Sequence, residues 1–156
     1  MKKDIEYMLL ALDEARKALS EGEVPVGCII VDKNDSIISM AYNKVESNKD
    51  ATHHAEVLAI RKATQVVGDW RLLGATLYTT LEPCFMCAGA TILSRLKRVV
   101  YGCMDPRHGA AGSLVNLFAI DHPIHKVEIE GGVLEKEAAL LLRQFFQERR
   151  KKKCLV

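Results

Sequence analysis

Two cysteines three residues apart, Cys84 and Cys87, constrain this chain more than any other feature. On a helix such a pair lies on one face, so both sulfurs can reach a single metal ion. Pro83 suits the first turn of that helix, whose N–H groups and dipole lower thiol pKa values. Earlier in the chain, His54 and Glu56 open a second helical segment, where cap geometry can bring both toward one site. The sequence therefore predicts two helix starts that meet at one metal site.

The expected metal is zinc. Two thiolates and one imidazole leave one position of a tetrahedral zinc ion open for water, which is typical of a catalytic site. We therefore expect one Zn²⁺ per chain, held by His54, Cys84 and Cys87, and no organic cofactor. Water bound to zinc ionises near neutral pH, and Glu56 would accept its proton and deliver it to a ring and a leaving amine. The order H-x-E followed by P-C-x-x-C is known from zinc-dependent nucleobase deaminases.

Two other interpretations of the cysteines stay open at this point. A lone C-x-x-C pair can be a thioredoxin-like redox pair, although the H-x-E partner argues against this. A structural zinc would need a fourth ligand, for which His53, Cys103 and His108 are the candidates, none at a regular spacing to the pair. Cys28 lies in an apolar segment and is expected in the core, whereas Cys154 lies in the C-terminal tail and is expected to be incidental.

The length and the charge of the chain indicate the general class of protein to which it belongs. A chain of 156 residues suits one domain, and no apolar run reaches the roughly 18 residues that span a bilayer. The apolar patch 8–12 is too short for a signal peptide, so we expect a cytoplasmic protein without membrane contact. The net charge of +2 conceals a basic tail at 149–156 with five of the 22 basic residues; the remainder has 17 basic and 20 acidic residues. Only a local surface is thus expected to favour polyanions.

Hydrophobic periodicity predicts alternating strands and helices. Helices are expected at 4–20, 54–67, 84–94 and 135–150, and Gly22 and Gly68 stand where the first two end. Strands are expected at 24–31, 36–42, 75–80, 98–101 and 126–130, with a turn at 33–35, a polar loop at 43–52 and a glycine-rich loop at 102–113. This order indicates an α/β layered fold whose sheet is mixed because it contains one hairpin.

From the first helix to the end of the last, the chain resembles the bacterial tRNA-specific adenosine deaminases of the cytidine/deoxycytidylate deaminase superfamily. The zinc motif alone indicates only the superfamily, which includes cytidine, cytosine and guanine deaminases. The loop from Asp105-Pro106 to Gly112-Ser113 and the pair Phe145-Phe146 narrow the resemblance to the tRNA branch. Further similar segments are 23–27, Asn43, 52–56, 77–84, 86–90 and 98–102.

The resemblance implies a three-layer fold with a five-stranded mixed sheet flanked by helices, and a homodimer. It implies hydrolytic conversion of adenosine to inosine at the wobble position of an arginine tRNA, whose anticodon stem-loop is the partner. By the same resemblance, substrate contacts would come from Asn43 with the flipped adenine, the Ala55 N–H with its ring, Asp105 with a neighbouring ribose, Arg107 with phosphate and Phe145 in the pocket wall.

The chain departs from the family pattern at His53, Phe85, Arg107 and His108. His53 precedes the expected ligand, but its register with Glu56 favours His54. Arg107 keeps a phosphate-binding charge, and His108 is expected to be a tolerated loop residue.

Two rival functions are considered. The first is a free guanine or cytosine deaminase on the same fold, which would act on the base without a polymer. The second is a non-catalytic, zinc-stabilised RNA-binding module, which would not need Glu56.

Overall fold

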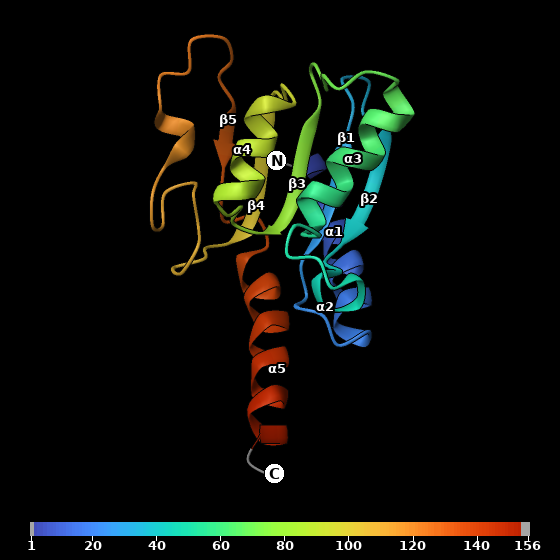
Figure 1. Cartoon of the computed structure of the whole chain (residues 1–156), viewed down its shortest axis with the longest axis vertical. Coiled ribbons are helices and arrows are strands. Elements are labelled where there is room, and N and C mark those ends of the chain that lie inside the picture. The colour runs from blue at the N-terminus through green and yellow to red at the C-terminus, as the bar shows by residue number, and fades with distance from the viewer. Residues whose placement is uncertain (1, 154–156) are drawn as a thin grey trace.

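Five strands form one mixed sheet at the centre of the computed structural model, which describes residues 2–153 (Figure 1). The strand order is β2-β1-β3-β4-β5; β1 is antiparallel to both of its neighbours, while β3, β4 and β5 run parallel. The strands are β1 Gly27–Val31, β2 Ile37–Tyr42, β3 Thr76–Leu81, β4 Arg98–Cys103 and β5 Glu128–Glu130. The predicted α/β fold with a five-stranded mixed sheet is confirmed.

Helices cover both faces of the sheet and give three layers (Figure 1). In β1, Ile29 and Val31 pack toward α1, whereas Cys28 and Ile30 pack toward α3. Burial on both faces explains why this strand reads as an uninterrupted apolar run. The helices are α1 Lys2–Ser20, α2 Val45–Asn48, α3 Ala55–Val67, α4 Phe85–Leu93, the 3₁₀ turn η1 Leu117–Ala119 and α5 Glu135–Lys153. Among the described residues no helix has the length and apolarity to cross a membrane.

Several predicted boundaries were wrong. The first strand begins at Gly27 rather than at residue 24, because the segment before it contains Pro25, which has no N–H for a sheet ladder. The predicted loop 43–52 contains the single-turn helix α2. The last helix continues to Lys153, so the described part of the basic tail is the end of α5, while Cys154 lies outside the described residues.

The contact between α1 and β1 requires a glycine at position 27. A Cβ atom there would lie 2.0 Å from the Ala11 carbonyl oxygen and 2.5 Å from the Ala15 nitrogen. Both are backbone atoms of α1 and cannot move aside as a flexible side chain would. Gly27 therefore lets the helix backbone approach the sheet directly.

A buried ion pair joins α1 to the sheet. Asp4, 6% exposed, accepts hydrogen bonds from Arg98 Nη1 at 2.7 Å and from the Tyr78 hydroxyl at 2.9 Å. The Arg98 hydrogen bond is the main reason that the pKa of Asp4 falls from 3.8 to about 2. Because the folded-state pKa is lowered, this stabilisation is present above pH 3.8 and is lost as the pH falls through 2.

Asp4→Asn should therefore lower the free energy of unfolding by about 2 kcal/mol at pH 7. The difference from the unsubstituted protein should narrow progressively between pH 5 and pH 2, where the native carboxylate also becomes protonated. Urea unfolding of both proteins across this range measures the difference. A gap that stays constant down to pH 2 would show that the charge on Asp4 contributes nothing.

Candidate active site

The starts of α3 and α4 meet at one place, as predicted. His54 and Cys84 are the residues before the first turns of these helices, both with extended backbone, and their carbonyl groups accept the first helical hydrogen bonds. Cys87 lies on the first turn of α4 and is fully buried, whereas Cys84 and His54 are half-buried. A residue at a helix cap and the third residue of the helix face each other, which brings the two sulfurs together.

The three side chains fit a zinc ion. His54 Nδ1 lies 3.5 Å from the sulfurs of both Cys84 and Cys87, and all three ligand atoms lie within 4.8 Å of one another. A tetrahedral ion with Zn–S near 2.3 Å and Zn–N near 2.0 Å separates a bound sulfur from a bound nitrogen by roughly 3.5 Å. This is the only such group among the described residues.

The other candidate ligands lie elsewhere. The His53 ring contacts Asn48 Nδ2 at 2.8 Å and Asp50 Oδ2 at 3.2 Å, away from the cysteines. The Cys103 sulfur lies 3.6 Å from the Thr80 carbonyl oxygen, and His108 is exposed on a loop. None of the three belongs to the cluster of ligand atoms, which favours a three-ligand site over a structural zinc with four protein ligands.

The pKa values of the Cys84 and Cys87 thiols are shifted in opposite directions. Hydrogen bonds from Cys87 and from His54 lower the pKa of the Cys84 thiol to about 4, and the hydrogen bond to Cys84, together with burial, raises the pKa of Cys87. The hydrogen bond to Cys84 also raises the pKa of His54. Zinc binds thiolates, so a bound ion would displace the protons that these thiols carry.

Glu56 lies beside this group but is not part of it. Its carboxyl is 4% exposed, accepts a hydrogen bond from Thr79 Oγ1 at 3.2 Å, and lies 3.5 Å from the Cys87 sulfur. Burial raises the pKa of Glu56. A carboxyl that protonates more readily than usual, next to a metal group, is suited to accepting and returning a proton.

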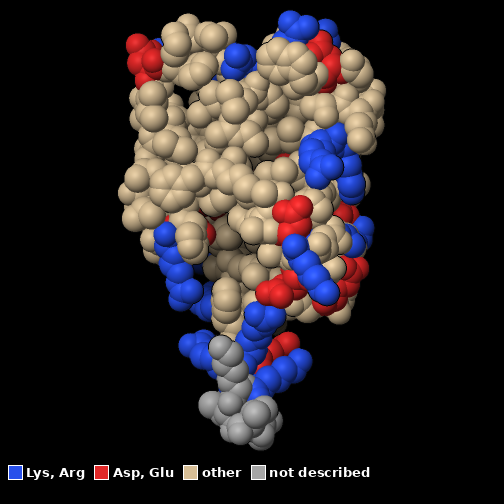
Figure 2. Space-filling model, viewed as in Figure 1, with Lys and Arg blue, Asp and Glu red and all other residues tan. Residues whose placement is uncertain are grey.

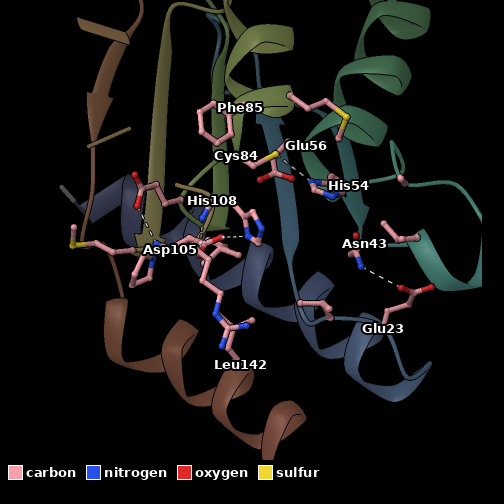
Figure 3. Close-up of a pocket in the computed structure, with 18 of the residues that line it drawn as sticks. Glu23, Asn43, His54, Glu56, Cys84, Phe85, Asp105, His108 and Leu142 are labelled. Carbon is pink, nitrogen blue, oxygen red and sulfur yellow. Dashed lines mark hydrogen bonds and ion pairs between the residues drawn. The ribbon is translucent and has the colours of Figure 1, made fainter. Parts of the chain in front are cut away.

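His54, Glu56 and Cys84 face a cavity of about 810 Å³ (Figure 3). This volume is within the range of small-molecule sites. Asn43 and Glu23 line one wall, residues 104–108 line another, and α5 closes the cavity with Leu142 and Phe146. The reacting groups therefore lie in a cavity whose other walls come from loops and from the last helix.

A buried carboxylate fixes the loop 104–113. Glu82, 1% exposed, accepts hydrogen bonds from the Asp105, Ala111 and Ser113 N–H groups at 2.9–3.0 Å and from the Ser113 hydroxyl. A Cβ atom at Gly109 would lie 2.4 Å from the Glu82 carboxylate, so the loop packs directly on it. Glu82 belongs to the similar segment 77–84, but no role was predicted for it.

The predicted substrate residues are distributed around this cavity. Asn43, Asp105 and Arg107 line it, and Ala55 is the buried first residue of α3, where an N–H has no partner within the helix. Asp105 Oδ1 accepts hydrogen bonds from the Arg107 and His108 N–H groups at 3.0 and 3.3 Å. Asp105 thus holds the turn of its own loop as well as facing the cavity.

The prediction for Phe145 needs a correction. Phe145 is 4% exposed and does not line the cavity, whereas Phe146, 42% exposed, does. On α5, Ala138, Leu141 and Phe145 form the buried row, and Leu142 and Phe146, four residues apart, form the row that faces the cavity. One residue along a helix turns a side chain by about 100°.

Comparisons with known proteins agree with this geometry. Residues 1–103 match the family described as "Cytidine and deoxycytidylate deaminase zinc-binding region". A protein of Bacillus subtilis named "tRNA-specific adenosine deaminase" is 48% identical over 98% of this chain and 94% of its own length. A Haemophilus influenzae protein of the same name is 43% identical over 96% of this chain and 87% of its own length. A solved structure from a study of A-to-I editing by tRNA:A34 deaminases at the wobble position of transfer RNA has a TM-score of 0.81 and 39% identity, covering 88% of this chain and 99% of that one.

Proposed function

Because the chain belongs to the cytidine and deoxycytidylate deaminase family, and within it to the tRNA-specific adenosine deaminases, we propose that it hydrolyses adenosine to inosine at the wobble position of tRNA. The observation that carries the proposal is the shared cavity: a His-Cys-Cys group and a separate buried glutamate face the same space. An arginine tRNA as the substrate is implied by the family resemblance and stays a prediction.

His54, Cys84 and Cys87 would hold one zinc ion. When bound, zinc lowers the pKa of a water molecule toward neutrality and so supplies the nucleophile. Glu56 accepts a proton from the water and delivers protons to the ring nitrogen and the departing amine, so that water and adenosine yield inosine and ammonia. The hydrogen bond from Thr79 Oγ1 holds the Glu56 carboxyl in place, and the Ala55 N–H, which has no partner within α3, would donate to the ring.

The RNA contacts would come from the loops. A base in a single-stranded loop can be turned into a pocket at a low unstacking cost, which suits an anticodon loop. Asn43 would contact the flipped base, Asp105 a ribose hydroxyl and Arg107 a phosphate, while Phe146 rather than Phe145 would contribute to the wall. Figure 2 shows Lys and Arg gathered on the distal end of α5, where they add a positive surface for the RNA backbone.

We also propose a homodimer. Figure 2 shows few charged side chains over α4 and the segment around η1, and Leu93 and Ile120 in that region are 64% and 60% exposed. Exposed apolar side chains on a surface with few charges favour an interface. The cytoplasm is the proposed location because the proposed substrate is tRNA.

The rival functions have less support. The curated relatives that match nearly the whole chain carry the tRNA-specific name, which does not favour a free guanine or cytosine deaminase. A non-catalytic RNA-binding module would not explain a buried Glu56 directed at the metal group.

The test is to incubate the purified protein with total bacterial tRNA and to measure inosine by nucleoside mass spectrometry. We expect inosine to accumulate at the wobble position, and no deamination of free guanine or cytosine. Release of ammonia from a free base, without inosine in tRNA, would overturn the proposal in favour of the first rival.

A further inference from the structure

A buried glutamate with no part in the catalytic steps lies on the cavity wall opposite the loop 104–113. Glu23 is fully buried, and four donors surround its carboxylate. Oε1 accepts from the Ser47 N–H at 2.6 Å and from the Ser47 hydroxyl at 2.7 Å. Oε2 accepts from the Glu46 N–H at 3.2 Å and from Asn43 Nδ2 at 3.1 Å. A carboxylate offers about four acceptor positions, so all of them are used.

These bonds keep Glu23 ionised. Burial alone would raise the pKa of Glu23, but the hydrogen bonds from Ser47 and Glu46 outweigh it and lower the pKa. An ionised carboxylate only accepts hydrogen bonds. The Asn43 side chain must therefore present a hydrogen-bond donor to the Glu23 carboxylate.

This requirement fixes the orientation of the Asn43 amide. Its two ends have nearly the same shape but opposite hydrogen-bonding character, and only the NH₂ end can face Glu23. Figure 3 shows the nitrogen of Asn43 directed at Glu23 and its oxygen on the side of His54. The Asn43 backbone is fixed as well, because its N–H donates to the Val26 carbonyl at 3.0 Å. No donor from the described residues reaches the side-chain oxygen, which leaves it for a ligand.

We propose that Glu23 is a positioning residue that sets base specificity by fixing which way round the Asn43 amide lies. This inference rests on the proposed function, in which Asn43 contacts the base. With the amide fixed, the cavity presents one carbonyl oxygen and one remaining N–H in constant positions. A reversed amide would exchange the positions of its donor and its acceptor, so the same base edge would meet groups that cannot pair with it. Unpaired buried polar groups of this kind reduce binding strongly.

The test variant is Glu23→Gln, which keeps the shape of the side chain but can donate as well as accept. The Asn43 amide can then lie either way round. We expect kcat/KM on an anticodon stem-loop to fall at least about tenfold, the effect of one lost hydrogen bond, with an unchanged zinc content. Glu14→Gln is the matched control, because Glu14 is a buried glutamate of α1 that pairs with Lys17 and does not line the cavity. It should leave kcat/KM within about twofold of the unsubstituted protein.

Asn43→Ala separates positioning from a merely structural role. If Glu23 acts through Asn43, then adding Glu23→Gln to Asn43→Ala should cause little further loss of kcat/KM, although it should still lower the melting temperature. Equal fold-losses of kcat/KM in the two backgrounds would overturn the inference. If turnover of the double variant is too slow to measure, the Kd of the same stem-loop gives the same comparison. Failure of the proposed function itself is distinguishable, because the unsubstituted protein would then form no inosine.

Discussion

Glu56→Gln should reduce turnover of tRNA by about 10²- to 10⁴-fold while the protein keeps its fold and one zinc ion per chain. Glutamine matches glutamate in size but cannot accept and return a proton. The structure places this carboxyl beside the metal group without including it among the three ligand atoms. Single-turnover inosine formation measures the loss, and elemental analysis measures the zinc.

Glu14→Gln is the matched control for this variant. Glu14 is another buried glutamate, 4% exposed, on α1 and paired with Lys17, away from the cavity. It should leave turnover unchanged. If Glu56→Gln instead lost its zinc, the carboxyl would be a metal ligand, and its assignment as a proton shuttle would be wrong.

Cys87→Ala should abolish both zinc binding and activity. Cys87 is fully buried, and its sulfur is one of the three ligand atoms that join the starts of α3 and α4. Because a metal that binds only the folded state adds its binding free energy to stability, the melting temperature should also fall, and added zinc should no longer raise it. Zinc per chain and thermal unfolding with and without zinc are the measurements.

Cys103→Ala controls for the loss of a buried thiol. Cys103 is 4% exposed, but its sulfur contacts the Thr80 carbonyl rather than the metal group. This variant should keep one zinc ion and its activity. A full complement of zinc in Cys87→Ala would mean that another side chain completes the site, with Glu56, 3.5 Å from the Cys87 sulfur, the first to examine.

The metal group was predictable from sequence because each ligand is fixed by local structure. A C-x-x-C pair at a helix start and an H-x-E segment at another each depend on the few residues around them. The ambiguity between His53 and His54 needed tertiary structure, because only the folded chain shows the His53 ring held by Asn48 and Asp50.

The features that were missed depend on distant residues. The single turn α2 is too short for a hydrophobic period, and Glu23, more than twenty positions earlier, accepts two of its N–H groups. Buried glutamates such as Glu23 and Glu82 look like surface residues in a sequence, since charged side chains are usually exposed. Phe145 was predicted to line the cavity, but its neighbour Phe146 does so. Which of two adjacent apolar residues faces the cavity depends on how the helix is rotated about its axis, and apolar composition alone does not determine this.

Glu23 and Glu82 hold two walls of the cavity, the segments 43–47 and 104–113, and this arrangement affects how substrate preference can change during evolution. The groups that carry out the reaction sit at the rigid starts of α3 and α4, whereas the side chains that would read the substrate lie in segments bound to the scaffold through backbone N–H groups. Backbone N–H groups are present in every residue except proline, so an exposed side chain such as Arg107 can be replaced while these bonds persist. Preference for a nucleobase can therefore drift during evolution while the hydrolytic chemistry is inherited unchanged.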